Sequence, residues 1–352
     1  MIPNVRRATR IRPAIRLMKA GNVAAGYRAV KAAPGRPRAA TQLAPMAASS
    51  RRALLGAMAA NLAIAATKFL IGGITHSTVM IAEAIHSVVD TGNSTLMLLG
   101  RARSRRGPDA EHPFGHGMEL YFWSFLVAMV IFGGGACLST YEGIRALVHP
   151  RPVSLLWPNY LVIGAAAVFE GASLVIGWRE FAAYRRESHF TGSALDVMRE
   201  SKNPAIFVTV LEDMAALAGL AVAAVGLTLS HLLDAPAIDA VASIVIGAIL
   251  AVEAALLGVE TRGLITGEAV RPILLDRIRD VVARHSDIGS IAEIRTLQLG
   301  PDAVLLLLGI RPSRRSELGE VEVVSSRLTT ELRRITPTIK HVAFYVADRN
   351  SG

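Results

Sequence analysis

The sequence predicts a bundle of six transmembrane helices followed by a small α+β cytoplasmic domain with a ferredoxin-like order of elements. Of the 352 residues, 52% are hydrophobic and only 19% are charged, and the apolar residues are concentrated before residue 265. A helix that crosses the bilayer core needs about 20 mainly apolar residues. Six stretches have this length, at about 53–74, 78–100, 119–146, 157–182, 204–231 and 237–261. The chain therefore divides into an extension over 1–50, a transmembrane domain over 51–264 and a soluble domain over 265–352.

The net charge of +10 comes entirely from the first fifty residues. This segment holds ten Arg and Lys and no acid, and the other 28 of the 38 basic residues balance the 28 acids. The charge therefore does not indicate a nucleic-acid partner. The Pro, Ala and Arg-rich segment is predicted to be disordered and to lie against anionic lipid. An organellar presequence, or a translation start at Met46, are the alternatives.

The distribution of basic residues predicts the topology. Arg and Lys cluster after the second span and between the fourth and fifth, whereas the links 74–77 and 230–235 hold none. By the positive-inside rule, both termini are expected in the cytoplasm. We expect a multi-pass protein of a bacterial plasma (inner) membrane, with an organellar membrane as the alternative. The basic residues that decide the topology are Arg101, Arg103, Arg105, Arg106, Arg185, Arg186, Arg199 and Lys202.

After residue 265 the periodicity indicates a helix at about 270–284, strands at about 291–299 and 303–311, a helix at about 317–334 and a strand at about 340–347. Residues 300–302, Gly-Pro-Asp, form a turn between the first two strands. This αββαβ order predicts a small antiparallel sheet with both helices on one face.

The second span carries Glu83, His86, Asp90 and Asn93 at spacings of three, four and three. These spacings place all four side chains on one helical face. Ionisable groups inside a membrane are costly and normally face the bundle interior or a water-filled cavity. A functional site is therefore the first interpretation, and a buried polar cluster that only fixes helix packing is the alternative.

The fifth span adds Thr209, Glu212 and Asp213, of which Thr209 and Asp213 share a face and Glu212 points about 100° away. One imidazole and two or three carboxylates suit zinc, and also manganese, cobalt or ferrous iron. The lone cysteine, Cys137, excludes a cysteine-rich zinc module. Because these ligands must lose protons to bind metal, metal entry displaces protons and proton return ejects metal.

Two further groups of residues are candidates. Glu170 in the fourth span is either a proton relay or a snorkelling acid, and Glu253 in the sixth is expected to reach the interface. The cytoplasmic loop between spans two and three is either a second metal site or a solvated polar loop. It holds Asp109, Glu111, His112 and His116.

These motifs resemble the cation diffusion facilitators, a family of dimeric metal/proton antiporters. The resemblance rests on HPFGHG at 112–117, on AEAIHSVVD at 82–90, on His149-Pro150 and on the αββαβ tail. It implies a homodimer in a lipid bilayer that moves a metal ion as substrate and binds no cofactor. It also implies that His86, Asp90 and Asp213 are metal ligands, and that Asp109, His112 and His116 match a loop trio of some members.

The chain departs from the family pattern at three places. Thr209 stands where the family usually has His or Asp, so that Thr209, Glu212, Glu83 or water is left to complete the site. Met118 replaces a frequent lysine. The tail has only His285 and His341, with Asp348 at its end, and we expect it to dimerise without a binuclear metal site.

These observations predict an efflux transporter that exchanges zinc, or manganese, iron or cobalt, for protons by alternating access at a site between spans two and five. A passive metal channel or a metal-sensing membrane protein is the alternative. An enzyme is not expected, since no nucleophile lies near His86 and the tail is too small for a substrate domain.

Overall fold

The computed structural model describes residues 46–187, 196–197, 202–284, 290–311 and 318–347. The chain separates into two compact units, Met1–Leu54 and Leu55–Gly352. Several sequence predictions lie outside the described residues, namely most of the basic extension and the residues Arg199, His285 and Asp348.

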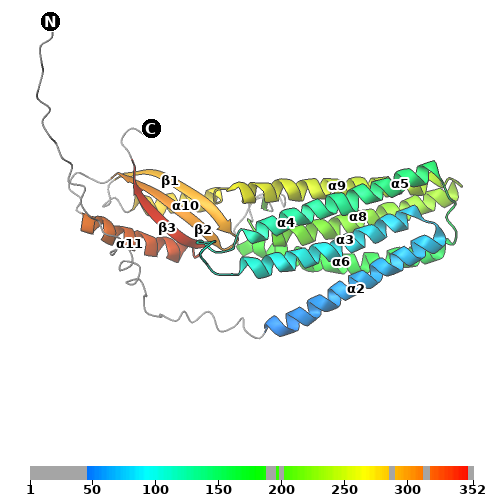
Figure 1. The fold of residues 1–352 in the computed structure, drawn as a ribbon, viewed down its shortest axis with the longest axis horizontal. Coiled ribbons are helices and arrows are strands. Elements are labelled where there is room, and N and C mark those ends of the chain that lie inside the picture. The colour runs from blue at the N-terminus through cyan, green and yellow to red at the C-terminus, as the bar shows by residue number, and fades with distance from the viewer. Residues whose placement is uncertain (1–45, 188–195, 198–201, 285–289, 312–317, 348–352) are drawn as a thin grey trace, which may run out of the picture. The chain divides into compact units, whose positions relative to one another are not determined.

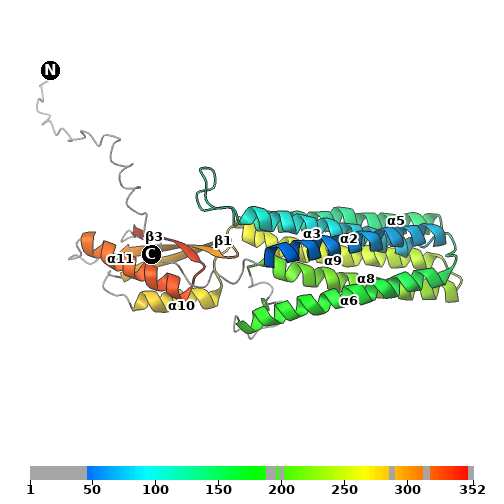
Figure 2. The ribbon, with the colours of Figure 1, turned by 90° about the horizontal axis from the view of Figure 1, so that it is seen from below.

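The membrane domain consists of long helices that run side by side (Figures 1 and 2). Among the described residues, five segments are long and apolar enough to cross a membrane: Met58–Thr75, Glu119–Val148, Leu156–Arg186, Phe207–Leu232 and Ala237–Thr266. The multi-pass membrane prediction is thereby confirmed. The remaining long helix of this domain is the one that carries the polar face predicted for span two. The helices are α2 (Met46–Thr75), α3 (Thr78–Ser104), α4 (Glu119–Val130), η1 (Ile131–Cys137), α5 (Leu138–Val148), α6 (Leu156–Glu187), α8 (Pro204–Leu232) and α9 (Ala237–Thr266).

Helix α3 begins at a cap to which α9 contributes. Ser77 accepts a hydrogen bond from the backbone N–H of Met80 at 3.3 Å. Asp239 of α9 accepts bonds from the N–H groups of Thr78 and Val79, at 2.5 and 3.2 Å. The first N–H groups of a helix have no partner within it, and carboxylate acceptors at this end are stabilising. Asp239 therefore sets where α3, the helix with the polar face, starts relative to α9.

The third span contains a π-helical segment, η1, built around Gly133, Gly134 and Gly135. A Cβ atom at Gly134 would lie 3.3 Å from Val89 of α3, and one at Gly135 would lie 3.1 Å from Leu250 of α9. Glycine at these positions lets the span approach both helices closely, as small residues do in membrane bundles.

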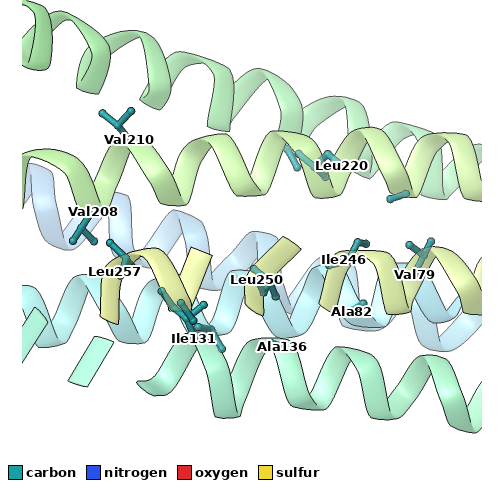
Figure 3. Packing of buried hydrophobic residues seen from close by; sticks show 14 of the residues in the cluster. Val79, Ala82, Ile131, Ala136, Val208, Val210, Leu220, Ile246, Leu250 and Leu257 are labelled. Atoms are coloured by element: carbon teal, nitrogen blue, oxygen red, sulfur yellow. The ribbon is translucent and has the colours of Figure 1, made fainter. Parts of the chain in front are cut away.

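The core of the bundle is an apolar cluster shared by α3, η1, α8 and α9 (Figure 3). Ile131, Leu220, Leu250 and Leu257 are each 2% exposed or less. Since lipid tails are as apolar as these side chains, close van der Waals packing rather than exclusion of water stabilises the contact.

The soluble domain has the predicted element order but not the predicted sheet. Its elements are α10 (Pro272–Ala283), β1 (Ser290–Gly300), β2 (Ala303–Arg311), α11 (Leu318–Ile335) and β3 (Ile339–Val346). The strand order is β1-β2-β3, with β1 antiparallel and β3 parallel to β2. The expectation of an antiparallel sheet was therefore wrong for β3. Helix α11 carries the chain back along β2 before β3 starts, and such a crossover produces a parallel pair.

Both helices of this domain pack on one face of the sheet, as predicted (Figure 2). Ile278 of α10 and Leu328 of α11 share a buried cluster with Leu306 and Leu308 of β2. Another row of residues crosses all three strands: Glu293 pairs with Gly309, and Gly309 pairs with Tyr345. The Tyr345 hydroxyl donates a hydrogen bond to Glu293 at 2.5 Å, across the glycine. This bond contributes to lowering the pKa of the Glu293 carboxyl.

Candidate metal sites

The polar face predicted for span two is buried in the bundle. His86 and Asp90 lie one helical turn apart on α3, and Nε2 of His86 is 3.4 Å from Oδ2 of Asp90. Glu83 and Asn93 on the same face are fully buried, and His86 is 2% exposed. The structure thus places an imidazole beside a carboxylate inside the membrane domain, as the spacing predicted.

The two acids of α8 point to different neighbours. Asp213 is buried, and its Oδ2 accepts a hydrogen bond from Ser173 of α6 at 2.9 Å. Glu212 has a buried Oε1 atom without a hydrogen-bond partner, and its charge interacts with those of Asp90 and Glu253. Thr209 is exposed. In this conformation Glu212, rather than Asp213 or Thr209, is the α8 residue that faces the acids of α3 and α9.

Several buried polar atoms of this region lack hydrogen-bond partners among the described residues. They are both ring nitrogens of His86, both carboxylate oxygens of Glu253, and one oxygen each of Glu83 and Glu212. Unpaired polar atoms in a protein interior cost free energy and are rare, so their concentration on α3, α8 and α9 requires an explanation. Nitrogen and oxygen donors held in this way are suited to bind a divalent metal ion.

Glu253 was expected to reach the membrane interface, and this prediction was wrong. Its side chain is 4% exposed and lies near the middle of α9, because the helix continues to Thr266 rather than ending near 261. Glu170 of α6 is half-buried, and its charge interacts with those of Asp90 and Glu212. Both acids therefore belong to the electrostatic surroundings of the α3 site.

Lys68 of α2 was not predicted as a site residue. Its ammonium group is buried and lies 3.0 Å from Oε2 of Glu83 and 2.9 Å from Oγ of Ser87. A lysine inside an apolar stretch of span length is itself a signal, since charged residues are rare in such positions and are usually paired. The signal was present in the predicted span 53–74.

The loop between α3 and α4 brings together the second predicted group. Donor atoms of Asp109, His112 and His116 all lie within 4.8 Å of one another, and no other group of three His, Cys, Asp or Glu does so in the part of the chain that the structure describes. Oδ1 of Asp109 is 3.4 Å from Nδ1 of His112, and Oδ2 is 3.4 Å from Nε2 of His116. Glu111 does not belong to the trio. Three donor atoms this close together could hold a metal ion.

Backbone contacts hold the trio in place. The N–H groups of His112 and Glu111 donate to Oδ1 of Asp109 at 2.7 and 3.0 Å, and they lower the pKa of this carboxyl, with the His112 contact the largest cause. His116 is 8% exposed, and its Nδ1 lies 3.2 Å from the Gly107 carbonyl oxygen. Asp109 therefore stays ionised, and one imidazole is oriented, before any metal binds.

The glycines of the loop motif have separate roles. Gly115 adopts φ of 87°, a left-handed conformation that favours glycine. Gly117 lies against the end of β1, where a Cβ atom would be 2.4 Å from the Leu299 carbonyl oxygen. Phe114, which precedes Gly115, packs edge-on against His341 of β3, with ring centroids 5.1 Å apart. His341 is thus a packing residue, as expected for an isolated histidine.

Comparison with known proteins settles the family. The cation efflux transmembrane domain matches residues 54–265, which include all of α3 and the loop trio. The chain belongs to the cation diffusion facilitators. Members of this family are transporters and not enzymes, and they carry metal ions as substrates rather than as cofactors.

Three relatives of this cation diffusion facilitator differ in how much of their length is aligned. The proton-coupled zinc antiporter SLC30A9, mitochondrial, of Mus musculus is 34% identical over 66% of this chain and 41% of its own length. Metal tolerance protein C4 of Arabidopsis thaliana is 30% identical over 72% of this chain and 55% of its own. Magnetosome protein MamM of Paramagnetospirillum magneticum is 25% identical over 79% of this chain and 83% of its own. The chain therefore spans about half or less of the length of the first two relatives.

Proposed function

We propose that this protein exports a divalent transition metal ion from the cytoplasm in exchange for protons, with zinc as the first candidate substrate. The observation that carries the proposal is the group of buried, unpartnered nitrogen and oxygen donors on α3, α8 and α9. Manganese, cobalt and ferrous iron use the same donor types, and no thiolate lies in the set to favour a softer metal.

The donors we assign to the transported ion are His86 and Asp90 of α3 with Glu212 of α8, and Asp213 joins them in another conformation. In the conformation described here, Asp213 is bonded to Ser173 of α6. Movement of α8 against α6 would break this bond and turn the carboxylate to the ion. Such rigid-body movement of helices around a central site is the usual basis of alternating access.

Proton coupling follows from the chemistry of the donors. An imidazole or carboxylate binds a metal only through its deprotonated form, so the ion and protons compete for the same atoms. Metal from the cytoplasm displaces protons, and protons from the opposite side displace the metal.

Two structural parts of the proposal go with this mechanism. We infer that α3 is the sixth transmembrane helix, because it is 27 residues long and packs in the bundle core with its polar face buried. We also infer that the loop trio of Asp109, His112 and His116 binds a second metal ion at the cytoplasmic entrance, and that the protein acts as a homodimer.

The relatives support zinc as the substrate and coupling to protons. The mouse protein is named a proton-coupled zinc antiporter of mitochondria, and the other two are named for metal tolerance and for the magnetosome. We propose a bacterial plasma (inner) membrane or an organellar membrane as the location, with both termini in the cytoplasm or its organellar equivalent.

The proposal is tested by zinc flux in proteoliposomes that carry a pH gradient. His86→Ala and Asp90→Ala should each reduce flux to the background of empty liposomes. Thr95→Ala, an exposed position on the same helix, is the matched control and should transport like the wild type. Wild-type flux in either site variant would refute the site. Flux that persists after the pH gradient is collapsed and follows only the zinc gradient would instead indicate a passive channel.

A further inference from the structure

Lys68 and Glu83 form an ion pair deep in the membrane domain that the transport chemistry described so far does not use. Both side chains are almost fully buried, with relative exposures of 2% and 0%. Burying two opposite charges is costly, and such pairs add little net stability compared with apolar packing. A pair that is expensive to bury and adds little stability suggests a role beyond holding α2 and α3 together.

The pair lies directly beside the donors assigned to the metal. The Lys68 ammonium also donates to Oγ of Ser87 at 2.9 Å, and Ser87 is the residue after His86. The charge of Lys68 acts on both His86 and Asp90. Lys68 therefore lies against the Glu83 end of the α3 polar face.

Lys68 bonds to one of the two carboxylate oxygens of Glu83 and leaves the other without a partner in the part of the chain that the structure describes. Oε2 of Glu83 accepts the hydrogen bond from Lys68. Its Oε1 is buried and has no hydrogen-bond partner among the described residues. This oxygen lies close to Gly219 of α8, where a Cβ atom would be only 2.5 Å from it. Glu83 is one helical turn from His86 on the same face, a spacing at which two side chains can share one ion. Without Lys68, both oxygens of this carboxylate would be free to bind a cation.

We propose that Lys68 is a positioning residue that holds Glu83 out of the metal's ligand set, so that the site binds the ion weakly enough to release it. The inference rests on the proposed transport function. A transporter must let its substrate go on the far side, and an extra anionic ligand would tighten binding and slow release. Lys68 thereby sets the balance between affinity and turnover.

The test compares Lys68→Met, Lys68→Arg and the double variant Lys68→Met with Glu83→Gln, all in the full chain. Zinc affinity is measured by isothermal titration, and flux is measured in proteoliposomes. Lys68→Met should bind zinc more tightly, by on the order of tenfold, and transport it with a lower maximal rate, because Glu83 becomes available as a ligand. Lys68→Arg keeps the charge and should stay close to the wild type.

The double variant is the decisive one. It removes both charges together and leaves the assigned ligands in place. Its zinc affinity should therefore return to within about threefold of the wild-type value. Thr67→Val, an exposed neighbour on α2, is the control for changes in that helix. An unchanged or weaker affinity in Lys68→Met would overturn the proposal.

Two other outcomes separate this proposal from the function on which it rests. A large loss of zinc affinity in the double variant would show that Glu83 already coordinates the ion in the wild type. This result would also overturn the proposal, and it can be obtained even if Lys68→Met does not fold. If His86→Ala kept normal affinity and flux, the transport site itself would be wrong. Normal Lys68 variants together with an inactive His86→Ala would refute only the role of Lys68.

Discussion

Ser173 of α6 donates a hydrogen bond of 2.9 Å to Oδ2 of Asp213, and this bond holds a predicted metal ligand away from the donors of α3. If Asp213 exchanges Ser173 for the metal during transport, the serine competes with the ion. Removing the competitor favours the metal-bound arrangement.

Ser173→Ala should therefore bind zinc more tightly, by about three- to tenfold, which corresponds to the net free energy of one hydrogen bond. Isothermal titration of the purified protein measures this change. Gly171→Ala on the same helix is the control, since its added methyl group meets nothing within 4 Å. An affinity equal to that of the wild type would mean that Asp213 is not a ligand of the metal.

Glu212 and Thr209 are the two α8 candidates for the remaining ligand position, and the structure distinguishes them. Glu212 has a buried, unpartnered oxygen, whereas Thr209 is exposed. Glu212→Gln, which removes the charge at constant shape, should weaken zinc binding by at least about tenfold, a loss that even outer partners of metal sites produce. Thr209→Val should change affinity less than about twofold on the same scale. The reverse order in titrations would assign the position to Thr209.

Zinc binding at the loop trio should weaken as the pH falls. The pKa of Asp109 is lowered by the backbone N–H groups of His112 and Glu111, so this carboxylate stays ionised below its ordinary range. An imidazole binds a metal ion only through its deprotonated form, so protons compete with zinc at His112 and His116. The dissociation constant should rise by up to about two log units per pH unit as both are protonated.

This pH dependence is measured by zinc titration between pH 7.5 and 5.5 in a protein that carries His86→Ala and Asp90→Ala, so that the loop site is observed alone. Glu111→Gln, outside the trio, should leave the profile unchanged. His116→Ala should abolish the binding, because it removes the buried imidazole. A dissociation constant that does not change with pH would contradict imidazole ligation.

Gly117 is expected to tolerate no side chain. A Cβ atom there would lie 2.4 Å from the Leu299 carbonyl oxygen and 3.1 Å from Cα of Gly300, and backbone atoms cannot move aside as a flexible side chain does. Gly117→Ala should cost about 1–3 kcal/mol, as overpacking typically does, and lower the thermal unfolding midpoint in detergent. Gly107→Ala in the same loop meets nothing within 4 Å and is the matched control. Equal midpoints for the two variants would show that the close contact at Gly117 does not form.

Much of the fold was predictable because it depends on short-range patterns. Runs of apolar residues predicted the long helices, and the change of periodicity after residue 265 predicted the αββαβ order. The parallel pairing of β3 could not be read from the strand sequences, because it depends on the path of α11 between them. The position of Glu253 was missed for a related reason: the helix extends beyond its most apolar stretch, so an acid near the predicted end lies in its middle.

The candidate sites divide in the same way. Residues within a few positions of one another, such as His86 with Asp90 and the loop trio, were determined by the sequence alone, because helical and turn geometry brings near neighbours together whatever surrounds them. The tertiary structure decided which side chains from distant segments meet. Only the packing of the helices directs Asp213 to Ser173, Glu212 to the acids of α3 and α9, and Lys68 to Glu83, since crossing angles and rotations of long helices are set by contacts along their whole length.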